Sequence, residues 1–210
     1  TTIACDDNNG PGNYALLNLT GRTPGEVIFV RLVDTQSNEE GTFNICAHDV
    51  SVPCHPDFTT MVAFYNATGG PAWTTKTGWQ AGAAGTNCNV CSWYGVQCNE
   101  LNRVSVINLS SHNVTTNVLP SVLTNLTYLT ELKLYNNSLS GNFPTFLESF
   151  EYLNTIDFGN NSFTGNIPTY LGNMSKLKNL YLDGNAFSGS LPISLTNLDL
   201  SLIYVNNNNL

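Results

Sequence analysis

A register of 24 residues governs the second half of this chain. Proline recurs at that interval, and glycine and asparagine recur in the same register. The recurring residues are Pro120, Pro144, Pro168 and Pro192, then Gly141, Gly165 and Gly189, then Asn137, Asn161 and Asn185. A period of about 20 to 50 residues is typical of a solenoid, in which each coil buries its apolar face only against its neighbours.

The pattern within each period is L-x-x-L-x-L-x-x-N-x-L. One full copy begins at Leu129, and others begin at Leu153, Leu177 and Leu200, with a looser copy from Val104. The central L-x-L predicts a short strand whose two apolar side chains point inward. The asparagine side chain is expected to satisfy backbone groups in the turn that follows, and the other apolar residues to stack on the next coil.

The end of each period reads L-S-G-N-F-P, F-T-G-N-I-P or F-S-G-S-L-P. These phrases resemble the plant-type leucine-rich repeat. Over residues 104–210 the resemblance implies an α/β solenoid with parallel strands on its concave face, about four and a half repeats of roughly 24 residues, and an extra short strand before each proline. The last copy stops midway through a coil, so no C-terminal cap is expected within this segment.

Residues 51–103 are expected to cap the solenoid with a small helical and hairpin domain. Asp57 is predicted to N-cap a helix that ends at Gly69 and Gly70. The apolar residues predicted to share one face of this helix are Phe58, Met61, Val62 and Tyr65. The phrases A-F-Y-N-A-T-G-G-P-A-W and C-S-W-Y-G-V-Q-C resemble the N-terminal cap of the same family, which implies that Trp93 lies over the first coil.

Six cysteines, an even number, fit disulfides formed in an oxidising compartment. The cap resemblance implies the pairs Cys91–Cys98 and Cys54–Cys88. Cys5 and Cys46 then remain to pair with each other. A zinc site at Cys88-x-x-Cys91 is the alternative, but no second Cys or His pair follows at the required spacing.

Residues 1–50 have no helical period. Strands are predicted at residues 14–20, 26–34 and 41–47. The phrases A-C-D-D-N-N-G-P-G, P-G-E-V-I-F-V-R-L and G-T-F-N-I-C resemble the latter half of a secreted accessory β-sandwich module, which implies a partial antiparallel sandwich. Asp6 and Asp7 could ligate calcium through their oxygens, but a solvated turn is the simpler explanation for so short a motif.

Charge and motif content exclude several classes of function. The net charge is −8 with only 7 Lys and Arg, which argues against binding to nucleic acid or anionic lipid. Apolar runs are far shorter than the roughly 18 residues that cross a bilayer, so no membrane insertion is expected. No nucleophile, phosphate-binding or paired-histidine motif accompanies His48, His55 or His112, so neither an enzyme nor a cofactor is predicted.

Two sets of residues mark the surface of the predicted solenoid. N-linked glycans are predicted on the N-x-S/T sites Asn18, Asn66, Asn108, Asn113, Asn125, Asn136, Asn160 and Asn173. Outward positions on the concave strands are Lys133, Tyr135, Asp157, Tyr181, Asp183 and Tyr204. The tyrosines could anchor a ligand or be an ordinary solenoid face, and glycans on Asn108, Asn136 and Asn160 would shield it.

Two functions remain for an extracellular chain of this kind, whether secreted or on the cell surface. The favoured interpretation is a structural glycoprotein whose open ends assemble head-to-tail, with copies of itself, into a filament, sheath or matrix. The alternative is a recognition ectodomain that binds a peptide, another extracellular protein or a glycan on its concave face.

Overall fold

In a computed structural model, residues 54–79 and 88–210 are described with their side chains, and residues 2–6, 14–18 and 46–47 by their backbone. The chain divides into two compact units. One comprises Thr1–Cys54 with Ala84–Thr86, and the other comprises His55–Ala83 with Asn87–Leu210. The second unit contains the repeats together with most of the segment expected to form the cap, from His55 onward except Ala84–Thr86.

The first unit contains a three-stranded antiparallel sheet of order β2-β1-β3. Its strands are β1 (Thr2–Asp6), β2 (Tyr14–Asn18) and β3 (Cys46–Ala47). β2 lies within the predicted strand 14–20, and β3 covers the end of the predicted strand 41–47. β1 was not predicted, and the strand predicted at 26–34 lies outside the described residues.

The second unit begins with helix α1 (Phe58–Ala67), which the apolar spacing predicted. Met61, Phe64 and Tyr65 are buried. Val62 is only partly buried, whereas Phe64, which the predicted face omitted, is fully buried. The cap continues through the 3-10 helices η1 (Gly70–Ala72) and η2 (Val90–Ser92) to strand β4 (Val96–Cys98).

Asp57 is the N-cap residue of α1, as the sequence predicted, but its side chain makes no cap hydrogen bond. Its carboxylate instead accepts hydrogen bonds from the Arg103 guanidinium and the Val104 amide, at the start of the first coil. A 2% exposed carboxylate satisfied by these donors joins the cap to the solenoid.

Three tryptophans fill the cap. The ring centroids of Trp73 and Trp79 lie 4.9 Å apart, and those of Trp79 and Trp93 lie 5.0 Å apart. All three side chains are buried, and they belong to one hydrophobic core that continues into the repeats. The cap thus closes the N-terminal end of the solenoid with apolar surface.

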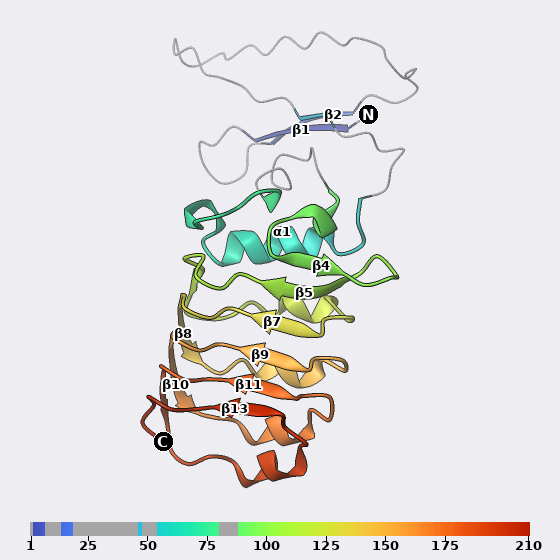
Figure 1. Ribbon diagram of the computed structural model, residues 1–210. Coiled ribbons are helices and arrows are strands. Elements are labelled where there is room, and N and C mark those ends of the chain that lie inside the picture. The colour runs from blue at the N-terminus through green and yellow to red at the C-terminus, as the bar shows by residue number, and fades with distance from the viewer. Residues whose placement is uncertain (1, 7–13, 19–45, 48–53, 80–87) are drawn as a thin grey trace. The chain divides into compact units, whose positions relative to one another are not determined.

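The main sheet has the order β13-β11-β9-β7-β5-β4, and Figure 1 shows its strands stacked coil upon coil. All neighbours are parallel except the β4–β5 pair, which is antiparallel. The repeat strands are β5 (Val104–Asn108), β7 (Glu131–Lys133), β9 (Thr155–Asp157), β11 (Asn179–Tyr181) and β13 (Leu202–Tyr204). The registered residues Ile107, Leu132, Ile156 and Leu180 are fully buried, as the L-x-L pattern predicts.

A second parallel sheet of order β12-β10-β8-β6 precedes the prolines, as the plant-type resemblance implied. Its strands are β6 (Thr115–Thr116), β8 (Ser138–Asn142), β10 (Ser162–Asn166) and β12 (Ala186–Ser188). Each of the four periodic prolines is then the N-cap residue of a short 3-10 helix. These helices are η3 (Ser121–Asn125), η4 (Thr145–Ser149), η5 (Thr169–Asn173) and η6 (Ile193–Asn197).

The repeated asparagines link neighbouring coils as well as their own turns. Asn161 Nδ2 donates to the carbonyl of Leu134 in the preceding coil at 2.9 Å and to that of Phe158 in its own coil at 3.1 Å. Its Oδ1 accepts from the amide of Leu139 at 3.0 Å. Asn137, Asn185 and Asn208 repeat this arrangement. The sequence predicted only the contacts within the turn.

Candidate functional site: the concave sheet face

The concave face consists of three outward positions per coil. The row nearest the middle contains Asn108, Lys133, Asp157, Tyr181 and Tyr204, which are in register across the sheet. One row before it contains Val106, Glu131, Thr155, Asn179 and Leu202. The row after it contains Ser110, Tyr135, Gly159, Asp183 and Asn206 by the same register. All six predicted outward residues lie in these rows.

Tyr135 and Asp183 converge over Gly159. A Cβ atom placed on Gly159 would lie 2.9 Å from Asp183 Oδ1 and 3.1 Å from Tyr135 Cδ2. The absence of a side chain at this position therefore allows the two side chains to approach from the coils on either side. Tyr135 is further fixed because its hydroxyl accepts a 2.7 Å hydrogen bond from Asn160 Nδ2.

Two carboxylates make this part of the face acidic. Among the described residues, neither Asp157 nor Asp183 forms an ion pair, whereas Lys133 pairs with its strand neighbour Glu131 at 2.5 Å. Burial raises the pKa of the Asp157 carboxyl, and the nearby Asp183 raises it further, although the Gly159 amide and Lys133 act in the opposite direction. Three carboxylates, those of Glu131, Asp157 and Asp183, and the one ammonium group of Lys133 together carry a net charge of −2.

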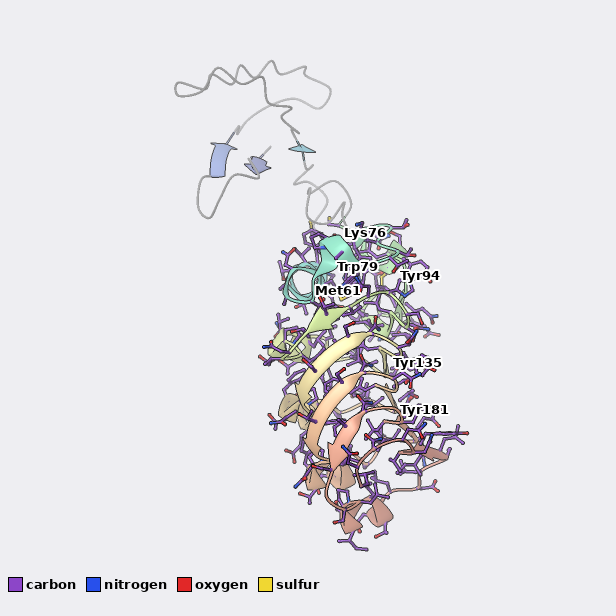
Figure 2. The ribbon with its side chains drawn as sticks, turned by 90° about the vertical axis from the view of Figure 1, so that its left-hand side faces the viewer. Met61, Lys76, Trp79, Tyr94, Tyr135 and Tyr181 are labelled. Carbon is purple, nitrogen blue, oxygen red and sulfur yellow. A yellow bond between two sulfur atoms is a disulfide. The ribbon has the colours of Figure 1, made fainter. Side chains whose placement is uncertain are left out.

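Aromatic side chains flank the carboxylates. Tyr181 and Tyr204 stack with ring centroids 5.4 Å apart and an angle of 19° between their planes. Figure 2 shows Tyr94, Tyr135 and Tyr181 following one another along the same side of the solenoid. Tyrosine combines a large rigid apolar area with a polar tip, which suits it to binding surfaces. This arrangement is compatible with both interpretations of the tyrosines, as anchors for a ligand and as an ordinary solenoid surface.

The seven predicted glycosylation sites whose side chains are described are all exposed. Asn18 lies in β2, where only the backbone is described. On and beside the concave strands, Asn136 Nδ2 donates to Ser111 Oγ and Asn160 Nδ2 donates to Tyr135 Oη. Asn108 differs, because no described residue accepts from its Nδ2. Exposure makes these asparagines accessible, and their modification remains a prediction.

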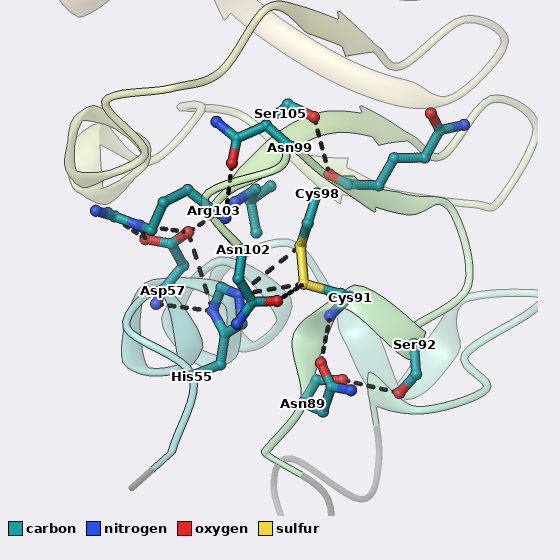
Figure 3. The surroundings of a disulfide bond; sticks show 12 residues. His55, Asp57, Asn89, Cys91, Ser92, Cys98, Asn99, Asn102, Arg103 and Ser105 are labelled. Atoms are coloured by element: carbon teal, nitrogen blue, oxygen red, sulfur yellow. Dashed lines mark hydrogen bonds and ion pairs between the residues drawn. A yellow bond between two sulfur atoms is a disulfide. The ribbon is translucent and has the colours of Figure 1, made fainter.

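The cap contains a disulfide between Cys91 and Cys98, the pair that the resemblance implied, with Cα atoms 5.5 Å apart (Figure 3). His55 Nε2 lies 3.2 Å from Cys91 Sγ. His55 Nδ1 accepts from the Asp57 amide at 3.1 Å, so the ring proton resides on Nε2. Burial lowers the pKa of His55, against the opposing effect of Asp57.

His55, Cys91 and Cys98 lie close enough together to hold a metal ion, because their possible ligand atoms are within 4.8 Å of one another. Because Cys91 and Cys98 are joined, neither offers a thiolate, and the geometry favours a disulfide over the alternative zinc site. Cys54 and Cys88 are not joined in the structure. Their segments are adjacent, since the His55 amide donates to the Cys88 carbonyl at 3.3 Å, and their pairing stays a prediction.

The remaining N-terminal predictions fall largely outside the described residues. β1 and β3 are antiparallel neighbours with Ala4 opposite Cys46, which places the backbone of Cys5 beside that of Cys46. Asp6 ends β1, and Asp7 and His48 lie outside the described part. The Cys5–Cys46 disulfide and the calcium ligands remain predictions.

Sequence reasoning missed a hollow at the N-terminal end of the concave face. Tyr94 and His112 meet there with ring centroids 4.8 Å apart, beside a cavity of about 390 Å³. Tyr94 lies within a cap motif and His112 in a turn, so no periodicity brings them together. The available sequence signal was the glycine that follows Tyr94, because Gly95 has a φ of 76° and leaves no space for a Cβ atom beside the Asn108 carbonyl.

Comparison with known proteins decides the family of the solenoid. The sequence profile of the Leucine Rich Repeat family matches residues 128–150, 152–174 and 176–198. The ectodomain of BIR2 from Arabidopsis thaliana matches with a TM-score of 0.66 and 28% identity, covering 74% of this chain and 81% of that one. The solenoid is a leucine-rich-repeat domain of the plant type.

This chain spans only a smaller part of the length of two further relatives. The Arabidopsis thaliana receptor kinase HAESA, solved with the peptide hormone IDA and the co-receptor SERK1, matches with a TM-score of 0.56 and 26% identity, over 72% of this chain and 30% of that one. The leucine-rich repeat receptor-like serine/threonine-protein kinase SKM1 from Arabidopsis thaliana is 40% identical over 53 residues, which are 25% of this chain and 6% of that protein.

These relatives change the order of the two functions considered for the leucine-rich-repeat chain. They are one ectodomain and two receptor kinases, which favours recognition, the alternative interpretation. They give no support to assembly into filaments. Among the described residues of this chain, no helix has the length and hydropathy needed to span a membrane.

Proposed function

We propose that this chain is an extracellular recognition module whose concave face binds an extended, basic segment of a peptide or protein. The convergence of Tyr135 and Asp183 over Gly159, beside Asp157, carries this proposal. Two carboxylates that form no ion pair within the described part of the chain, framed by tyrosines, provide charge complementarity to a lysine or arginine side chain. The peptide-bound structure of HAESA supports binding on a related solenoid.

The geometry suits one cationic side chain that lies on the face across the coils of β7 to β11. Tyr135 and Asp183 fill the space over Gly159, so Asp157 and Asp183 would provide acceptors beside a tyrosine ring against which the aliphatic stem of the ligand can pack. Tyr181 and Tyr204 extend the aromatic surface along the next coils. Backbone and remaining side chains of the ligand would follow the face along the solenoid axis.

Selection from a displayed library of random extended peptides tests this function. The wild-type chain is expected to enrich peptides that contain Lys or Arg. The double variant Asp157→Asn and Asp183→Asn is expected to bind the selected peptides at least about tenfold more weakly, a loss of about 1.4 kcal/mol. A matched double variant, Glu151→Gln and Asp199→Asn, makes the same change of charge at exposed positions outside the three concave rows.

Acidification provides a second readout of the same site. Because the pKa of Asp157 is raised, its carboxylate becomes protonated at a higher pH than an ordinary aspartate, and affinity for a basic peptide should fall there. Enrichment of peptides without basic residues, or equal affinity of wild type and the Asp157/Asp183 variant, would overturn the proposal. A loss of affinity in the Glu151/Asp199 control would assign the effect to net charge alone.

A further inference from the structure

The hollow beside Tyr94 offers a second kind of binding site, at the N-terminal end of the concave face. Its cavity of about 390 Å³ lies where strand β4 meets β5, lined by Tyr94, Gln97, Asn108, Ser110 and His112 among others. The volume falls within the range of small-molecule sites, about 300 to 1,000 Å³. The surface proposed to bind a basic peptide lies on the following coils, and none of its residues lines this hollow.

The lining of the hollow is polar but carries no acidic or permanently cationic side chain. Tyr94 is 44% exposed, and the ring of His112 lies against it. His112 is itself held, because its Nδ1 is hydrogen-bonded to the Ser110 carbonyl. Tyr94 is therefore a supported aromatic ring that stays partly open to solvent.

Two side-chain amides complete the site. Asn108 Oδ1 accepts from the amide and the hydroxyl of Ser110, at 3.2 and 2.9 Å, which fixes the orientation of the Asn108 side chain. Asn108 Nδ2 and the side-chain amide of Gln97 have no hydrogen-bond partner among the described residues. A side-chain amide is planar and carries an acceptor beside a donor, so it can form hydrogen bonds with two neighbouring hydroxyl groups of a ligand.

A pyranose ring has the chemistry that this lining matches. Its axial C–H groups form an apolar face that packs on an aromatic ring, and its hydroxyls form hydrogen bonds around the edge. A charged ligand would find no counter-charge within the hollow. We infer that the Tyr94 hollow binds one pyranose ring of a glycan, with Tyr94 as the stacking surface and Gln97 and Asn108 as hydrogen-bonding partners.

The pyranose has two sources that share this chemistry. Asn108 opens the sequence Asn-Leu-Ser, so the first sugar of an N-glycan attached to its Nδ2 would lie at the hollow. Alternatively, the sugar belongs to a glycan on another molecule. Among the concave glycosylation sites, Asn136 and Asn160 already use their Nδ2 atoms within the chain, which distinguishes Asn108 from both.

The first experiment measures sugar binding without a glycan on Asn108. The wild-type chain produced in a bacterial host carries no N-glycan and keeps both Asn108 and Ser110. Saturation-transfer NMR with N-acetylglucosamine, glucose and xylose is expected to show millimolar binding of at least one sugar. Adding Tyr94→Ala should weaken it at least about tenfold, whereas adding Tyr152→Ala should not. Tyr152 is a matched control because it is also 44% exposed but lies outside the hollow.

The second experiment identifies the source. Peptide mapping of the wild-type chain from a eukaryotic host establishes whether Asn108 is modified, and an endoglycosidase then trims any glycan to its first sugar. If the chain's own sugar fills the hollow, the trimmed chain melts at a higher temperature than the bacterially produced chain, and Tyr94→Ala reduces this difference whereas Tyr152→Ala does not. An unmodified Asn108 with sugar binding assigns the hollow to glycans of other molecules. Absence of both sugar binding and the Tyr94-dependent melting shift would overturn the inference.

Discussion

At the scale of single residues, Asp57 shows how a predicted cap residue serves a different contact. Its carboxylate binds Arg103 through Nε at 3.0 Å and Nη2 at 2.6 Å, and the Val104 amide at 2.8 Å. Asp57→Asn should lower the free energy of unfolding by about 2 to 3 kcal/mol, because it leaves a partly buried guanidinium without its counter-charge. Urea denaturation measures the change.

The ion pair between Asp199 and Lys178 provides the matched control for this prediction. The donor–acceptor distance is also 2.6 Å, but the Asp199 side chain is 97% exposed. Water screens such a pair, so Asp199→Asn should leave the urea midpoint unchanged. If both variants unfold at the same urea concentration, the Asp57 contacts do not hold the cap to the solenoid.

His55 gives the cap a predictable response to pH. Burial lowers its pKa in the folded chain below the ordinary value of 6.5. The unfolded chain then takes up the proton first, so the free energy of unfolding falls as the pH drops below about 6.5. His55→Gln should be less stable at neutral pH but flatten this dependence below about pH 6.5. Unchanged pH dependence in the variant would show that His55 is not its source.

At the scale of the elements, the repeated asparagines determine how strongly one coil is held to the next. We call Asn137, Asn161, Asn185 and Asn208, which link neighbouring coils through hydrogen bonds, the asparagine ladder. Asn161 connects the coils of β7 and β9 through donors and acceptors that are otherwise buried between them. Asn161→Ala should lower the free energy of unfolding by about 2 to 4 kcal/mol, since it leaves backbone groups unsatisfied. Asn142→Ala is the matched control, at an exposed position in β8. Equal urea midpoints would refute the ladder.

The sequence predicted the elements whose residues repeat. The L-x-L positions and the asparagine turns follow from a period of 24, because each coil makes the same contacts as its neighbours. The strands before the prolines were implied by the resemblance to the plant-type repeat. The contacts of Asp57 with Arg103 and of Tyr94 with His112 occur once, between segments far apart in the sequence. A period carries no information about them.

The concave site was partly predictable for the same reason. The outward register of Tyr135, Asp157, Tyr181 and Asp183 follows from strand alternation within the repeat. Their convergence depends on one departure from the pattern, the glycine at position 159, where the neighbouring coils have Tyr135 and Asp183. The departure creates the space, and only the packed coils show which side chains fill it.

At the scale of the whole molecule, the two ends of the solenoid differ in how their apolar residues are covered. The cap buries the inner residue of the first coil, Ile107, completely. In β13, the registered residue Ile203 is 41% exposed, and Leu202 and Tyr204 on either side are exposed to a similar degree. Coils in such an array are stabilised mainly by their neighbours, so local opening is expected to begin at β13.

Hydrogen exchange of the 210-residue chain measures this gradient directly. The amides of β13 should exchange fastest among the concave strands and those of β7 and β9 slowest, because these strands have coils packed on both sides. A ligand on Tyr135, Asp157 and Asp183 should protect β7 to β11 without slowing β13 equally, since it contacts the middle coils. Uniform exchange along the solenoid would mean that the coils open as one cooperative unit, and the peptide would then stabilise every strand to the same extent.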